Sequence, residues 1–320
     1  MELWEDLFKV SRGDIMSDVN NIISNTLEEL YNSTLERCQE VQENLILTGT
    51  FNINEIYSQF ITLNYDIAEK WQMEQKPPEL IINHGEYINK KNLADSESGI
   101  SFIIEELKRK NEGNRACFSL INMYDIIDSG DEAIPSFLVL QFSFSHYDPK
   151  TLLVTAYFRA LEVENFLPIN LAEICININK ICQHFPKIET FKLHLVAFRA
   201  QRIKNFSCLT KCTIDVIDSM KIMVLIDDGN RSEIVKLLQE KLNSKESVII
   251  TDGIQSLSKG MKLRGFEIIS EQIDEIVKAM NEVNTLRKST SVYNDKLKEK
   301  YQEISCNLEK ALKLIEEEWN

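Results

Sequence analysis

Apolar residues recur at three- and four-residue steps near both ends of the chain, which is the period of an amphipathic helix. From Ile15 to Leu45 this spacing predicts one long N-terminal helix that ends before Gly49. Between Glu267 and Asn320 the steps alternate between four and three, as in coiled coils. They predict two helices, with apolar series Ile269, Ile273, Ile276, Met280, Val283 and Leu297, Tyr301, Ile304, Leu308, Leu312, Ile315, Trp319. The bend between these helices is expected at residues 287–295, and the series fit packing on their own domain as well as pairing with another chain.

The middle of the chain has a different texture, because its apolar residues gather in short β-rich runs. Strands are predicted at residues 117–123, 136–144, 152–161, 190–200, 212–226 and 246–254. Helices are predicted at about 99–110, 170–185 and 231–244, and irregular structure at 74–100. This mixture predicts an α+β fold, a mixed sheet with flanking helices. The expected domains are an N-terminal helix (1–48), an α/β domain (49–266) and a C-terminal coiled-coil-like helical extension (267–320).

The charge balance limits the classes of partner. With 36 Lys and Arg against 50 Asp and Glu, the formal net charge is −14, so the surface repels phosphate backbones and nucleic acid is an unexpected partner. The first residues are acidic and no run of 18 apolar residues occurs, which disfavours a secretory signal and a membrane span. We therefore expect a cytoplasmic protein.

Cysteine and histidine spacing gives no sign of a metal site. The seven cysteines are scattered, and several lie inside apolar runs, as reduced core thiols do. The closest pair, Cys208 and Cys212, lacks a second pair of ligands at zinc spacing, and the four histidines never occur as HxxxH. Glycine-rich phosphate loops are missing from the sequence as well. We expect neither a metal nor a cofactor.

Residues 99–206 carry several short motifs in a particular order. Asn114-Arg115 opens a strand, Ile134-Pro135-Ser136-Phe137 precedes Gln141-Phe142, and Tyr157-Phe158-Arg159-Ala160 precedes Phe166-Leu167-Pro168-Ile169-Asn170. This order and spacing resembles thymidylate synthase and its sister pyrimidine hydroxymethylases, over about a third of the chain. The stretch from Tyr157 to Asn170 is the most specific part. The resemblance implies a thymidylate-synthase-like sheet domain and a homodimer formed through the faces of the two sheets.

The positions at which the chain departs from the family pattern predict that the activity of the family is lost. In the family a cysteine thiolate adds to C6 of the dUMP ring, and counting back from Gln141 places that cysteine at Ser136, with the adjacent family histidine at Phe137. A serine hydroxyl with no base beside it is a poor nucleophile. We therefore expect no catalytic residue, and we treat Ser136 as a degenerate position.

Several ligand-binding positions of the family are retained. Arg115 and Arg159 match phosphate-binding arginines, Asn170 matches the asparagine that reads the pyrimidine edge, and Glu162 replaces a folate-side aspartate. Gln141 completes the candidate ligand-binding set, whereas Ala116 and Ala160 replace polar members of the phosphate cradle. Each retained residue also has a plain explanation: the arginines as surface ion-pair partners, Asn170 as a helix N-cap, and Glu162 as a solvated charge.

Three hypotheses about function follow. The first is a non-catalytic, dimeric scaffold or nucleotide-sensing subunit whose helical extensions contact a protein partner; by analogy alone, it suits a multi-component bacterial system such as phage defence. The second is an enzyme that transfers a methyl or hydroxymethyl group to dUMP or dCMP, either with a shifted nucleophile such as Cys117 or Cys175 or by chemistry that needs no nucleophile. The third is a coiled-coil adaptor in which the sheet domain only dimerises.

Overall fold

The computed structural model describes residues 21–88, 99–129, 134–203, 210–244, 249–288 and 295–319. Its contacts divide the chain into two compact units. Unit 1 comprises Met1–Lys76, Asn83–Asn122 and Pro135–Lys204, and unit 2 comprises Pro77–Ile82, Met123–Ile134 and Asn205–Asn320. The main division therefore falls after residue 204, whereas the sequence analysis places boundaries after residues 48 and 266.

Unit 1 is built on a mixed sheet of seven strands. The strands are β1 (Asn21–Ser24), β2 (Gln42–Asn52), β3 (Cys117–Ser119), β4 (Phe137–Phe144), β5 (Thr151–Phe158), β6 (Leu161–Glu162) and β7 (Thr190–Gln201). Their order is β1-β2-β7-β5-β4-β3, and β6 extends the pairing of β7. β5 and β7 are parallel neighbours, and helix α7 (Phe166–His184) connects them through β6. The expected α+β fold with a mixed sheet is confirmed.

The prediction of one long N-terminal helix is wrong. Residues 15–20 lie outside the described residues, and the rest of the range forms β1, α1 (Leu27–Arg37) and β2. Thr26 begins the helix, because its Oγ1 accepts a hydrogen bond from the Glu29 amide at 3.1 Å. After α1 the buried residues Leu45, Leu47 and Phe51 alternate with more exposed ones, which is the two-residue period of a strand.

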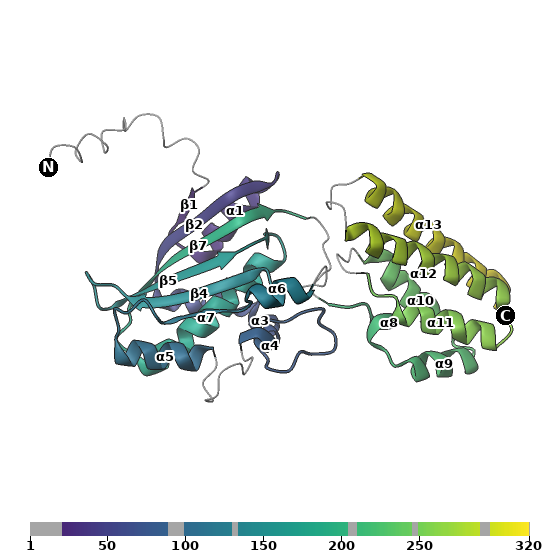
Figure 1. Ribbon diagram of the computed structural model, residues 1–320, viewed down its shortest axis with the longest axis horizontal. Coiled ribbons are helices and arrows are strands. Elements are labelled where there is room, and N and C mark those ends of the chain that lie inside the picture. The colour runs from purple at the N-terminus through teal and green to yellow at the C-terminus, as the bar shows by residue number, and fades with distance from the viewer. Residues whose placement is uncertain are drawn as a thin grey trace. The chain divides into compact units, whose positions relative to one another are not determined.

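The remaining helical elements of unit 1 form one layer. They are the 3₁₀ helix η2 (Ile53–Tyr57) and the helices α2 (Gln59–Thr62), α3 (Tyr65–Trp71), α4 (Gly85–Ile88) and α5 (Ile100–Arg109). Contacts of α1, α2, α3 and α5 with α7 place all of them on the α7 side of the sheet. Figure 1 shows α3, α4, α5 and α7 together on one side of the strands. Buried side chains such as Phe142, Val154 and Leu195 alternate with half-exposed neighbours.

The opposite face of the sheet is only partly buried. Strand register aligns Ile46, Val196, Tyr157 and Val139 in one cross-strand row, and all four side chains are half-buried. The next row contains Thr48, His194, Thr155 and Gln141. We call these eight residues the open sheet face. Because paired residues of neighbouring strands point to the same side, the face is continuous across β2, β7, β5 and β4.

Unit 2 is helical in the described part of the chain. Its helices are α6 (Met123–Ser129), α8 (Thr213–Val216), α9 (Ser219–Asp227), α10 (Arg231–Asn243), α11 (Asp252–Leu263), α12 (Glu267–Arg287) and α13 (Asp295–Glu318). The strand expected at 212–226 is wrong, because Asp218 caps α9 through the Met220 amide at 2.8 Å and its buried residues, Ile222 and Ile226, are one turn apart. The strand expected at 246–254 is also wrong, since α11 begins at Asp252, and residues 245–248 lie outside the described residues.

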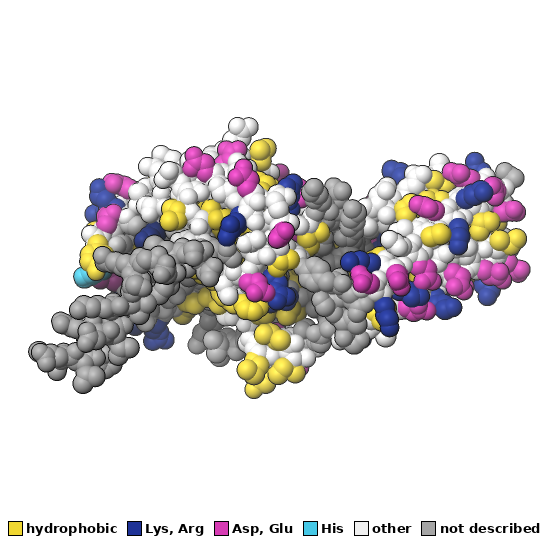
Figure 2. All heavy atoms as spheres, turned by 90° about the horizontal axis from the view of Figure 1, so that it is seen from above, with side chains coloured by type: hydrophobic (Ala, Val, Ile, Leu, Met, Phe, Trp, Pro, Cys, Tyr) yellow, Lys and Arg dark blue, Asp and Glu magenta, His cyan; other side chains and the backbone are white. Residues whose placement is uncertain are grey.

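The two C-terminal helices are confirmed, with the break where the sequence predicts it. Both apolar series point into the core of unit 2, where Ile273, Val283, Leu308 and Ile315 are buried and Tyr301 and Leu312 pack at its margin. The helices therefore use their apolar stripes within their own unit. Figure 2 shows acidic and basic side chains interspersed over the visible surface of this unit.

Candidate functional site

Four of the six candidate residues lie at one end of the sheet. Because β5 and β7 are parallel, their carboxyl ends meet at this edge, and the antiparallel strand β4 begins there. Ser136 precedes β4, Arg159 follows β5, and Glu162 and Asn170 lie just before and inside the first turns of α7. The carboxyl ends of parallel strands are a common place for ligand sites. We call this edge, with Ser136, Arg159, Glu162 and Asn170, the candidate site.

Ser136 and Arg159 are held together by the backbone. The Arg159 amide donates a hydrogen bond to the Ser136 carbonyl oxygen at 2.9 Å. The Arg159 Nε donates to the Pro135 carbonyl oxygen at 3.1 Å, which directs the guanidinium along the chain segment that carries Ser136. Among the described residues, no histidine or carboxylate forms a hydrogen bond with the Ser136 hydroxyl. Within the described ranges the geometry offers a cation beside Ser136 and no general base.

An aromatic cluster occupies the position after Ser136. Phe137 is fully buried, and its ring stacks on that of Phe158 with centroids 4.7 Å apart. The ring of His84 meets Phe137 edge-on at 5.5 Å, and Trp71 meets His84 at 4.8 Å. The residue that falls on the family's histidine is therefore a core side chain, which cannot donate, accept or move a proton.

Glu162 has a structural task that the sequence analysis missed. Its carboxylate accepts hydrogen bonds from the backbone amides of Glu164, Asn165 and Phe166 at 2.9, 2.7 and 3.2 Å. A fourth amide, that of Ile203, donates at 3.1 Å. The side chain is buried and satisfies the free amides at the start of α7, where a negative charge also meets the positive end of the helix dipole. The interpretation of Glu162 as a solvated charge is wrong.

Asn170 lies inside α7 rather than at its beginning. The helix starts at Phe166 with Asn165 as the N-cap residue, so the N-cap interpretation of Asn170 is wrong. Asn170 is buried. Pyrimidine recognition by Asn170 stays a prediction.

Arg115 and Gln141 lie apart from this edge, towards the outer strand β3. Gln141 pairs with Cys117 across β3 and β4, and its Nε2 donates to the Asn114 carbonyl oxygen at 2.9 Å. The Arg115 side chain is 72% exposed, and its Nε lies 3.9 Å from the Glu106 carboxylate. These two residues neighbour each other but do not join Ser136 and Arg159.

The thiols that could replace the missing nucleophile are unsuited to that task. Burial raises the pKa of the Cys117 thiol, and it raises the pKa of the fully buried Cys175 thiol much further. A nucleophilic cysteine needs the opposite shift, because the thiolate is the reactive form. Within the described ranges, no group of three or more histidine, cysteine or acidic side chains is arranged to hold a metal.

The structure adds a buried pair that sequence reasoning missed. His84 Nδ1 lies 2.9 and 2.8 Å from the two carboxylate oxygens of Glu173, and both side chains are buried. The two residues are 89 positions apart, so no local spacing could connect them. A hint was present, since Glu173 interrupts the apolar run of α7 and a buried carboxylate requires a partner.

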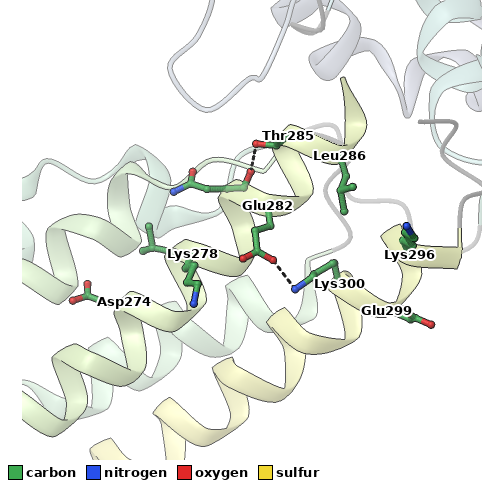
Figure 3. A pocket seen from close by; sticks show the side chains of 10 residues that line it. Asp274, Lys278, Glu282, Thr285, Leu286, Lys296, Glu299 and Lys300 are labelled. Atoms are coloured by element: carbon green, nitrogen blue, oxygen red, sulfur yellow. Dashed lines mark hydrogen bonds and ion pairs between the residues drawn. The ribbon is translucent and has the colours of Figure 1, made fainter. Parts of the chain in front are cut away.

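Unit 2 carries an open groove of about 930 Å³ between α12 and α13. Ten residues line it: Asp274, Val277, Lys278, Asn281, Glu282, Thr285, Leu286, Lys296, Glu299 and Lys300. Figure 3 shows Glu282 and Lys300 pointing towards each other across it, 2.5 Å apart, and Lys300 also pairs with Glu303 at 2.7 Å. These carboxylates raise the pKa of Lys300. Three acidic and three basic groups balance in the lining, so the groove favours neither anions nor cations.

Comparison with known proteins yields no match: neither a family model nor a curated protein matches the chain. None of the described helices has the length and apolar character needed to cross a bilayer. The candidate site, the open sheet face and the resemblance in residues 99–206 are therefore the features of the chain that bear on its function.

Proposed function

We propose that the protein is a non-catalytic, thymidylate-synthase-like subunit that acts as a dimeric scaffold or nucleotide sensor. The observation that carries the non-catalytic part is the surroundings of Ser136. The Ser136 hydroxyl has no base beside it among the residues that the structure describes, and the next residue is a phenylalanine in an aromatic cluster, so the proton transfer that nucleophilic catalysis needs has no evident donor or acceptor there. The raised thiol pKa values of Cys117 and Cys175 count against the alternative of a shifted nucleophile.

The open sheet face supports the dimer. Its central row, Ile46, Val139, Tyr157 and Val196, is apolar and half-buried, whereas the other sheet face is covered by the α7 layer. Contiguous apolar surface of this kind marks interaction sites. A second copy is the occupant that we propose, because two identical sheet faces can stack about a twofold axis. In the family that residues 99–206 resemble, the phosphate-binding arginine matched by Arg115 reaches across to the other subunit, and the Arg115 guanidinium is exposed here.

Sedimentation velocity tests the dimer. We expect the wild-type chain to sediment as a dimer and the Tyr157→Lys and Val196→Lys variants as monomers, since each places a charge in the central row. Tyr147→Lys is the matched control, because Tyr147 is 96% exposed and lies outside the open sheet face. A wild-type monomer, or dimeric row variants with normal circular dichroism, would contradict the proposal.

The sensing role rests on the two ligand groups that remain at the candidate site. Arg159 supplies a cation beside Ser136, and Asn170 supplies a buried amide. A ligand that binds only the native state raises the melting temperature by mass action. We expect millimolar dUMP or dCMP to raise the melting temperature of the wild-type protein and not of Asn170→Leu. If no pyrimidine nucleotide raises the melting temperature of the wild-type protein, the sensing role is excluded and the scaffold role alone remains.

The adaptor alternative is weakened by the burial of the C-terminal apolar stripes. Residues of α12 and α13 form a large part of the unit 2 core, so these stripes are already used within the chain. A protein partner of unit 2 would have to bind elsewhere, for example on the charged outer surfaces of these helices. Charge-reversing substitutions at the exposed residues Lys278 and Lys313 should therefore weaken partner binding. Core substitutions that leave unit 2 folded should weaken it less.

A further inference from the structure

The open sheet face continues onto the edge strand β1. Strand register places Asn21 beside Ile46 and Ile23 beside Thr48, so both β1 side chains extend the two rows of the face by one strand. Ile23 is 73% exposed although it is apolar. The apolar surface of unit 1 therefore reaches the strand with which the described part of the chain begins.

The same face carries positive charge and no carboxylate. Beyond the row that contains His194, strand register brings together Thr50, Lys192, Leu153 and Ser143. The Lys192 side chain is exposed. None of the residues in these three described rows is Asp or Glu, although acidic residues outnumber basic ones by 50 to 36 in the whole chain. An occupant with apolar and acidic side chains complements such a surface.

The first ten residues, which lie outside the described residues, have this composition. Four apolar side chains recur there with the i, i+1, i+4, i+5 spacing of one helical face: Leu3, Trp4, Leu7 and Phe8. Three acidic residues fall among the first six: Glu2, Glu5 and Asp6. Large aromatic side chains are frequent anchors of protein interfaces, so Trp4 and Phe8 suit the apolar row of the face.

The place of this segment in the chain keeps it near the face. Unit 1 includes the chain from Met1, and residues 11–20 join the segment to Asn21 of β1. Ten residues span up to about 33 Å. Four strand spacings separate β1 from β4 in the strand order, which is about 19 Å. The segment can therefore reach every strand of the face, at an effective concentration that a second chain in dilute solution does not have.

We propose that residues 1–10 bind the open sheet face of their own chain, with Trp4 and Phe8 on its apolar row, and compete there with the second copy. The docking depends only on the face and the segment, whereas the competition rests on the proposed function. In the monomer the segment shields the apolar row from water. It also raises the protein concentration needed for dimerisation, because each face must release its own segment before two faces stack.

Acrylamide quenching of tryptophan fluorescence tests the docking in the full chain, at protein concentrations where it sediments as a monomer. Trp71 and Trp319 are buried, so quenching reports mainly on Trp4. We expect Trp4 to be protected in the wild type and at least about threefold more accessible in Ile23→Glu, which places a carboxylate on the face. Leu63→Glu is the matched control, because Leu63 is 75% exposed in unit 1 and lies outside the face. Equal quenching of the wild type and Ile23→Glu overturns the docking.

Sedimentation equilibrium of the full chain tests the competition. The double variant Trp4→Ser, Phe8→Ser should lower the dissociation constant of the dimer at least about tenfold, because its faces are free to stack. Lys9→Ser is the matched control in the same segment and should dimerise as the wild type does. A dimer with the same dissociation constant in all three proteins overturns the proposal and leaves the proposed dimer intact. Conversely, monomers throughout with a protected Trp4 contradict the proposed dimer and support the docking.

Discussion

The two units use their apolar residues differently. In unit 2 the predicted stripes of α12 and α13 meet the buried residues of α10 and α11 in one core, although α6 and α9 expose large apolar side chains such as Met123 and Met220. Unit 1 buries one face of its sheet under the α7 layer and leaves the apolar row of the open sheet face half-exposed. The open sheet face of unit 1 is the surface on which we propose that a second copy docks, and all six candidate residues lie in unit 1.

In its described part, each unit nevertheless contains a deeply buried pair of polar side chains. In unit 2, Lys241 Nζ lies 2.5 Å from Asp215 Oδ2, with both side chains almost completely buried. In unit 1 the corresponding buried pair is His84 and Glu173. Burying such a pair costs desolvation free energy, and removing one partner alone strongly lowers the free energy of unfolding. They therefore offer a way to disturb one unit at a time.

The largest effect is expected from Lys241→Ala, which leaves the Asp215 carboxylate buried without its cation. We expect unit 2 to lose about 3 to 5 kcal/mol of unfolding free energy. Fluorescence of Trp319, in unit 2, should report earlier denaturation, whereas Trp71, in unit 1, should report little change. Lys236→Ala, at an exposed pair with Glu233, serves as control and should have no measurable effect. Equal shifts at both tryptophans would contradict the independence of the two units.

A smaller effect is expected from Glu162→Ala. The substitution leaves the first amides of α7 and the Ile203 amide without their acceptor, at a cost of about 2 kcal/mol. Glu162→Gln should fall between the alanine variant and the wild type, because it retains one acceptor oxygen. Urea denaturation measures the difference. A normal stability of Glu162→Ala, combined with a weakened ligand, would return Glu162 to the role of a binding residue.

Thiol labelling compares an exposed cysteine of unit 2 with a half-buried one of unit 1. Cys306 is exposed on α13, whereas burial raises the pKa of Cys117 and lowers its thiolate fraction at neutral pH. We expect iodoacetamide to modify Cys306 at least about tenfold faster at pH 7.5. The rate at Cys117 should keep rising with pH beyond the ordinary thiol range. Faster modification of Cys117 than of Cys306 at neutral pH would restore Cys117 as a candidate nucleophile.

The smallest effect is expected from Arg115→Ala. The guanidinium is well exposed and its contact with Glu106 is long, so the substitution should leave the monomer's stability unchanged in urea denaturation. The dimer should weaken, because the resemblance implies that this arginine reaches the second copy. Sedimentation at falling protein concentration measures this. An unchanged dissociation constant would remove Arg115 from the interface.

The sequence predicted the C-terminal helices α12 and α13 better than it predicted the N-terminal segment of the chain. The series from Ile269 to Trp319 is long and regular, and all of its members are buried in the structure except Tyr301 and Leu312, which are partly buried. Near the N-terminus the apolar spacing mixed two periods, and the two-residue alternation from Leu45 to Phe51 was hidden inside an apparent helix. At 212–226 dense isoleucine and valine favoured a strand, although helix packing decided the outcome.

For the candidate site, the sequence placed residues at one edge of the sheet but could not assign their bonds. Ser136, Arg159, Glu162 and Asn170 are adjacent because β4, β5 and α7 meet there, which the order of motifs already suggested. The capping bonds of Glu162 and the pairing of His84 with Glu173 depend on tertiary contacts. Such contacts join residues far apart in the chain and leave no local spacing to read.

The most direct test of the central claim is tritium release from C5 of labelled dUMP in the presence of methylene-tetrahydrofolate. We expect purified wild-type protein to release no tritium above the rate without protein. We also expect Ser136→Cys to remain inactive, because Phe137 and Ala116 still replace the neighbouring polar groups. Turnover by the wild type that disappears in Ser136→Ala would contradict the account, since Ser136 would then be a working nucleophile.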